Sequence, residues 1–140
     1  MIVKDITYTD YKGNEKTKKC YFNLTSIEIA EIETSEEGGL TGMINKIVET
    51  GDPSTIIKFF KTVILKSYGE VSEDGERFVK VDSNGIPLSV AFSQTEAYSK
   101  LFVEMVSDPN VFIQFINNLI PTDLVENLNE TPNLTTVTGN

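Results

Sequence analysis

Two Asp-Pro pairs define the starts of two helices and constrain this sequence more than any other feature. Asp52-Pro53 and Asp108-Pro109 each join an N-cap residue to a proline at the first helical position, where its missing N–H costs nothing. Apolar residues then recur at helical spacing: Ile56, Ile57, Phe60, Val63 and Ile64 after the first pair, and Phe112, Phe115, Ile116 and Leu119 after the second. Further apolar residues widen both faces, which predicts helices buried on more than one side.

A capping box predicts a third helix. Thr25 and Glu28 have the spacing at which each side chain satisfies a backbone N–H, and Leu24 and Ile29 are placed for a hydrophobic staple. The residues that follow partly alternate and also permit a strand, but the cap favours a short helix that Gly38-Gly39 ends.

Two more helices follow from periodicity. An apolar stripe predicts a helix that ends at Gly51, and it comprises Leu40, Met43, Ile44, Ile47 and Val48. Ser93 and Glu96 have the spacing of a second capping box. The helix expected after them has its apolar face on Tyr98, Leu101, Phe102 and Met105.

The N-terminal segment predicts a β-hairpin. Residues 2–9 and 16–23 have strand composition, and Tyr11–Asn14 supplies the turn. Its lysines favour solvated edge charges over a contact surface.

Between Glu70 and Ser89, Asp74-Gly75 and Asn84-Gly85 flank a short strand-like run, so a small hairpin or ordered loop is expected. The predicted class is α+β: an N-terminal β-hairpin followed by a bundle of about four to five short helices.

Composition suggests where the folded part ends. After Pro121 the sequence is rich in Thr, Asn and Glu and contains no aromatic residue. Such a segment lacks apolar surface to offset the entropy of ordering. We therefore expect one α+β domain over residues 1–121 and a mobile polar tail over residues 122–140.

The charge balance restricts the partner. Twelve basic and 21 acidic residues give a net charge of -9. This balance argues against nucleic acid and against anionic membranes, because both are bound through Lys and Arg. No apolar run is long enough to cross a bilayer, and Cys20, the single cysteine, fits a reducing cytoplasm. The expected partner is another protein.

Catalytic chemistry finds no support in the residue pattern. There is no histidine, which removes the commonest general base and metal ligand. Glycine spacing fits neither a calcium loop nor a phosphate-binding loop, so no catalytic residue, cofactor or metal ligand is predicted. One acidic group permits a carboxylate pair or a docking surface for a basic segment, but a solvated helix face is favoured; it comprises Glu28, Glu31, Glu33, Glu36 and Glu37.

Surplus apolar surface is the remaining functional signal. Wide apolar arcs on small helices belong either to a core or to a groove for a partner's helix. The candidate partner-binding face comprises Phe59, Tyr98, Phe102, Phe112, Phe115 and Ile116. Aromatic residues in such a stripe are more often core. A charged residue at 112 or 115 would then unfold the domain, whereas in a groove it would abolish binding alone.

Three blocks in order resemble the tail assembly chaperones of long-tailed phages of Gram-positive hosts. The first runs from Tyr21 through Glu28 to Leu40, the second is Ile64–Glu70 with Arg77–Lys80 after it, and the third is Phe92–Phe102 with Ile120-Pro121 after it. Together they cover roughly residues 16–121.

The resemblance implies a non-enzymatic chaperone. Such proteins bind the tape measure protein, keep it soluble and help recruit tail-tube subunits, so the implied partners are the tape measure protein and the major tail protein. The resemblance does not decide whether the chain forms a homo-oligomer. The implied location is the host cytoplasm, with absence from the mature virion. Two alternatives remain: a small structural tail or connector subunit retained in the virion, and a small hydrolase or metal-dependent enzyme that uses the acidic group.

Overall fold

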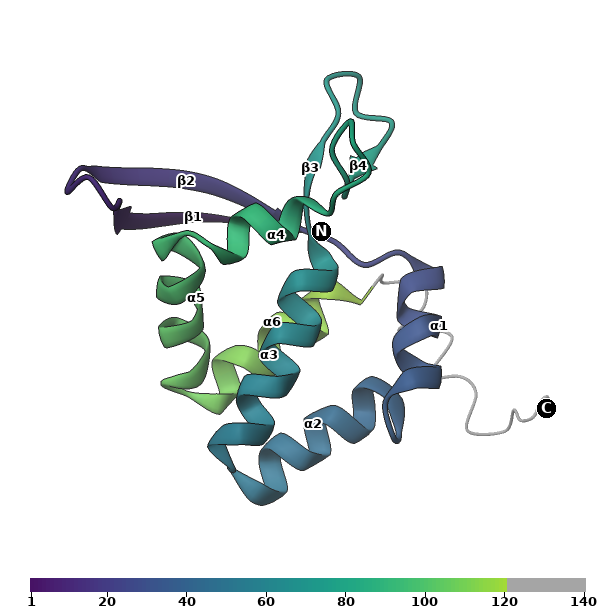
Figure 1. The fold of residues 1–140 in the computed structure, drawn as a ribbon. Helices are drawn as coiled ribbons and strands as arrows, with labels where there is room; N and C mark the ends of the chain where they lie inside the picture. The colour runs from purple at the N-terminus through teal and green to yellow at the C-terminus, as the bar shows by residue number, and fades with distance from the viewer. Residues whose placement is uncertain (121–140) are drawn as a thin grey trace.

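The structure is a computed structural model that describes residues 1–120 (Figure 1). Its elements are β1 (Ile2–Thr9), β2 (Glu15–Phe22), α1 (Ser26–Ser35), α2 (Gly39–Thr50), α3 (Pro53–Ser67), β3 (Tyr68–Val71), β4 (Phe78–Val79), α4 (Leu88–Ser93), α5 (Glu96–Val106) and α6 (Pro109–Leu119). The predicted α+β class is confirmed. One short helix, α4, was not predicted, and the tail predicted over residues 122–140 lies outside the described residues.

The predicted N-terminal hairpin is confirmed. β1 and β2 pair antiparallel from Ile2↔Phe22 to Thr9↔Glu15. The Asp10 carboxylate accepts hydrogen bonds from the backbone N–H groups of Lys12 and Asn14, which holds the turn. β3 adds to the end of β2, and β4 pairs with β3, so the strand order is β1-β2-β3-β4. The region between residues 70 and 89 therefore contains the small hairpin that its turn signals permitted.

Local capping signals place three of the helices. The Thr25 side chain accepts a hydrogen bond from the Glu28 N–H, and the Glu28 carboxylate accepts from the Thr25 N–H, which completes the predicted capping box of α1. Asp52 and Asp108 cap α3 and α6, each with proline in the first turn. These interactions span at most three residues, so each depends mainly on the local order of residues.

The predicted second capping box is wrong. Ser93 is the last residue of α4, and its hydroxyl donates a hydrogen bond to the Val90 carbonyl at 2.7 Å. α5 begins after Thr95 without a side-chain cap. The Glu96 carboxylate instead accepts a hydrogen bond from the Tyr11 hydroxyl at 2.9 Å, so a contact with the hairpin replaces the expected local bond.

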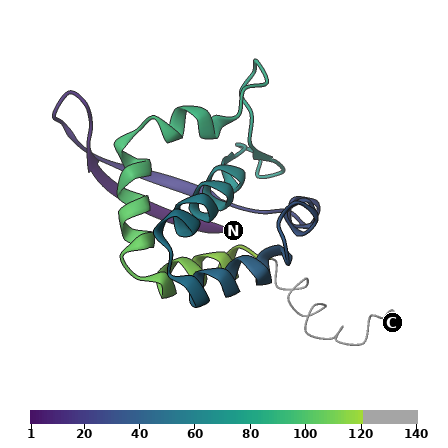
Figure 2. The ribbon, with the colours of Figure 1, turned by 60° about the horizontal axis from the view of Figure 1, so that its bottom comes forward.

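The core joins the inner face of the hairpin to the helices. α3 runs through the middle of the molecule, with α5 on one side and α1 on the other (Figures 1 and 2). Phe22 of β2 is fully buried and makes edge-to-face contacts with Tyr68, Phe92 and Phe115 at centroid distances of 5.8, 6.2 and 5.4 Å. One aromatic cluster thus connects β2, β3, α4 and α6.

Gly69 is required where β3 meets β4. A Cβ atom at this position would clash with the Phe78 ring and lie 2.6 Å from the Val79 carbonyl oxygen. Gly69→Ala is therefore expected to lower the free energy of unfolding by about 1–3 kcal/mol, since backbone and ring must both shift. Chemical denaturation measures the loss. Glu70→Ala changes the exposed neighbour in the same strand and serves as the control; equal stability of both variants would contradict the steric account.

Candidate partner-binding groove

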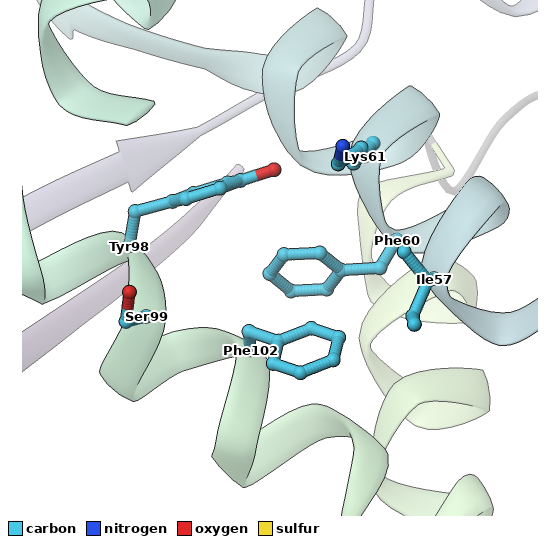
Figure 3. Close-up of a pocket in the computed structure, with 6 residues that line it drawn as sticks. All are labelled: Ile57, Phe60, Lys61, Tyr98, Ser99 and Phe102. Atoms are coloured by element: carbon cyan, nitrogen blue, oxygen red, sulfur yellow. The ribbon is translucent and has the colours of Figure 1, made fainter. Parts of the chain in front are cut away.

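A recess lies between α3 and α5 on the surface of the molecule (Figure 3). It has a volume of about 210 Å³, and its lining residues are Ile57, Phe60, Lys61, Tyr98, Ser99 and Phe102. Phe60 is buried and forms the floor, with ring centroids 5.4 Å from Tyr98 and 5.2 Å from Phe102. The two α5 rings are only partly buried, so the recess presents aromatic surface to its exterior.

A second recess continues the first. It has a volume of about 250 Å³ and is lined by Gly51, Pro53, Ile56, Ile57, Phe102, Val106 and Pro109. Ile57 and Phe102 belong to both recesses, so the two form one surface, which we call the α3/α5 groove. From Pro53 to Lys61 α3 extends about 12 Å, roughly two helical turns. The groove is therefore long enough for an apolar seam from two turns of a partner helix.

The α3 sequence explains why apolar surface remains exposed here. Its apolar arc is too wide for the core to cover: Ile56 and Phe60 are buried, whereas Ile57 is 39% exposed. On α5, Phe102 and Val106 are one turn apart and face the same side. Both helices thus contribute apolar side chains in excess of what the core takes up.

The polar groups of the groove gather at one end. Lys61, Ser99 and the Tyr98 hydroxyl line the first recess, whereas the second is lined by apolar side chains and glycine. Desolvation by burial raises the pKa of Tyr98, so this phenol is a hydrogen-bond donor at neutral pH. The groove can therefore accept an apolar segment with one hydrogen-bonding group at the Lys61 end.

The structure separates the six residues of the predicted partner-binding face. Tyr98 and Phe102 line the α3/α5 groove. The other four are buried with at most 5% exposure: Phe59, Phe112, Phe115 and Ile116. In this conformation the six do not share one surface: Tyr98 and Phe102 line the α3/α5 groove, whereas Phe115 lines a separate recess beside β1, α5 and α6.

Sequence reasoning overlooked most of the groove's lining. Periodicity places Ile57 on the apolar face of its helix but does not separate its exposed position from that of buried Ile56. Lys61, Ser99 and Val106 were not singled out. The width of the α3 apolar arc was the one available signal, because a core covers only part of such an arc.

The acidic group of α1 is largely occupied within the molecule. Glu31 pairs with Lys66, Glu36 with Lys58 and Glu37 with Lys46, at 3.1, 3.8 and 3.3 Å. The Glu33 carboxylate accepts a hydrogen bond from the Leu40 N–H. These contacts join the acidic group to α2 and α3 at the surface, where the side chains of Glu31 and Glu37 remain 59% and 87% exposed, as is typical of a solvated face.

Glu28 takes part in a further contact that we call the Lys80 cluster. The Lys80 ammonium donates to both Glu28 carboxylate oxygens and to the carbonyls of Asn23 and Lys66, at 2.7–2.9 Å. Desolvation would raise the pKa of Glu28, but hydrogen bonds from Lys80 and Thr25 outweigh it and lower this pKa. Desolvation lowers the pKa of Lys80, and Glu28 offsets only part of that shift. The cluster joins the β4 end to α1, β2 and α3.

Reactive and ligand-binding chemistry is sparse in the described part of the chain. Cys20 is buried, and desolvation raises the pKa of its thiol to about 11, so it is a packed neutral thiol. Residues 1–120 contain no cluster of three or more metal-ligating side chains. Among the same residues, none of the helices has the length and apolarity needed to span a membrane.

Comparison with known proteins supplies a family. Residues 1–139 match the family described as phage tail assembly chaperone. No curated protein and no solved structure gave a significant match. The family match covers nearly the whole chain, including both helices of the α3/α5 groove.

Proposed function

This chain belongs to the phage tail assembly chaperone family, and from that premise we propose that it binds the tape measure protein, keeps it soluble and helps recruit tail-tube subunits. The α3/α5 groove is the observation that carries the proposal. A chaperone for a long helical protein needs an apolar surface that stays accessible after its own folding, and the groove provides one over about two helical turns.

The charge of the chain suits this role. Each copy of the chain carries a net charge of -9, so neighbouring copies repel one another, which opposes aggregation. The apolar groove then binds the partner while the acidic remainder stays in solvent. We place this activity in the host cytoplasm before the tail is complete, with the chaperone absent from the mature virion.

The proposed role requires no catalysis. Binding in the α3/α5 groove depends on apolar contact and one polar end, and a chaperone that releases its partner leaves it chemically unchanged. Glu28→Gln together with Glu31→Gln tests the enzymatic alternative, because these substitutions remove the carboxylates that such chemistry would use. Under the chaperone proposal, the double variant keeps the tape measure protein soluble as long as it folds.

Ile57→Asp is the direct test of the groove. Ile57 belongs to both recesses and is already 39% exposed, so a carboxylate there is expected to leave the fold intact. Binding of a partner's apolar seam would remove water from this carboxylate, which costs free energy and weakens binding. Co-expression with the tape measure protein should yield at least roughly tenfold less soluble complex than the unmodified chain, a loss of about 1.4 kcal/mol or more in binding.

Val48→Asp is the matched control for that test. Val48 lies on α2, is 67% exposed and lies outside the groove, so its variant should keep normal co-purification. Equal loss in both variants would indicate a general effect of charge rather than a groove. A tape measure protein that stays insoluble beside the unmodified chain would refute the chaperone proposal and favour a subunit retained in the virion.

A further inference from the structure

The α3/α5 groove is free of acidic residues although the chain is strongly acidic. α3 contains three lysines and no aspartate or glutamate. The two acidic residues of α5 turn to the hairpin: Glu96 accepts a hydrogen bond from Tyr11, and Glu104 pairs with Lys4. Asp52 and Asp108 are the aspartates that precede groove residues Pro53 and Pro109. They cap α3 and α6 at the end of the groove opposite Lys61.

Lys61 is the α3 lysine left for a partner. Lys58 pairs with Glu36 and Lys66 pairs with Glu31, which draws both toward α1. Within residues 1–120, Lys61 has no carboxylate within ion-pair distance. It lies in the groove, and Figure 3 shows its amino group and the Tyr98 hydroxyl at the same end of the recess.

The Tyr98 hydroxyl completes the arrangement. Burial raises the pKa of this phenol, and its hydroxyl lies at the same end of the recess as the Lys61 amino group (Figure 3). A phenol donor and an ammonium at one end of an apolar surface both suit a carboxylate, and a partly desolvated site strengthens such charge-assisted bonds.

We propose that the α3/α5 groove binds an amphipathic helix that carries an aspartate or glutamate beside its apolar seam, and that Lys61 and Tyr98 donate to this carboxylate. The inference rests on the proposed function, in which the groove holds a partner protein. The carboxylate sets the register: it lies at the Lys61 end, while apolar residues one and two turns away fill the recess lined by Pro53 and Val106.

Lys61→Glu tests the inference, with Lys100→Glu as the matched control on exposed α5 surface outside the lining. The probe is the tape measure protein, and its dissociation constant is measured at low and high salt with each full-length variant. Lys61→Glu is expected to weaken binding roughly tenfold at low salt, because a like charge then faces the partner's carboxylate, and less at high salt. Lys100→Glu is expected to change it by less than about twofold.

Carbodiimide cross-linking identifies the partner group, because it joins an amine directly to a carboxylate. The expected product links Lys61 to an aspartate or glutamate of the tape measure protein, and changing that residue to lysine should restore binding to the Lys61→Glu variant.

Unchanged affinity of Lys61→Glu, with Ile57→Asp still defective, would overturn the carboxylate inference and leave the groove in place. Failure of the unmodified chain to bind would overturn the proposed function as well. A cross-link from Lys61 to a second copy of this chain would replace the inference with self-association.

Discussion

Replacement of Phe112 by aspartate is expected to unfold this domain. Phe112 is fully buried in α6 and packs against Phe60 of α3 at a centroid distance of 6.2 Å. Loss of the ring alone costs about 3–5 kcal/mol. An unpaired carboxylate in the core adds several kcal/mol more, and the sum approaches or exceeds the stability of a typical domain, about 5–15 kcal/mol. Loss of the cooperative thermal transition and of near-ultraviolet circular dichroism would show this result.

Val111→Asp is the control for that prediction. Val111 is the preceding residue, is 36% exposed and lies in the first turn of α6, where a negative charge interacts favourably with the helix dipole. Its variant should therefore fold with nearly unchanged stability. A folded Phe112→Asp variant that fails only in binding would contradict the assignment of Phe112 to the core and return it to the partner-binding face.

Lys80→Met is expected to cost about 2–4 kcal/mol of unfolding free energy. The methionine side chain is unbranched and only one atom shorter than lysine, but the Glu28 carboxylate and the Asn23 and Lys66 carbonyls lose their shared donor. A hydrogen bond to a charged group contributes about 1.5–3 kcal/mol to the unfolding free energy. The Glu28 charge left without its partner adds to the loss. The side chains of Lys80 and Glu28 are each about one-fifth exposed, so solvent screens part of the effect. Urea denaturation measures it, with Lys100→Met as the exposed control.

A double-mutant cycle with Glu28→Gln isolates the pair. The double variant should lose less stability than the sum of the single variants, because Glu28→Gln removes the uncompensated charge. The pH dependence follows from the lowered pKa of Glu28: the pair stabilises the fold above the unfolded value of 4.5 and loses that contribution as pH falls through the lower folded value. The penalty of Lys80→Met should therefore shrink on acidification. Strict additivity with a pH-independent penalty would argue against the pair.

The sequence by itself determined the elements whose causes are local. Asp52-Pro53 and Asp108-Pro109 start α3 and α6 as predicted, and Thr25 with Glu28 starts α1. In each case the side chain satisfies a backbone N–H no more than three residues away, so the interaction needs no distant partner. The hairpin is predictable for a similar reason, since its turn brings neighbouring strands together. The family resemblance likewise resided in ordered blocks of sequence and is confirmed over residues 1–139.

Only the tertiary structure decided which residues of each apolar helix remain accessible. Phe112 and Phe102 looked equivalent in sequence, yet the first is buried and the second lines the groove. Periodicity identifies an apolar face but does not tell which neighbour covers it. The same holds for polar contacts. Lys80 pairs with Glu28, 52 positions away in sequence. The Tyr11 hydroxyl donates to the Glu96 carboxylate, 85 positions away, and this contact replaces the capping bond expected at Ser93. Contacts at such separations arise from packing, and packing also leaves Lys61 in the α3/α5 groove without a carboxylate partner in residues 1–120.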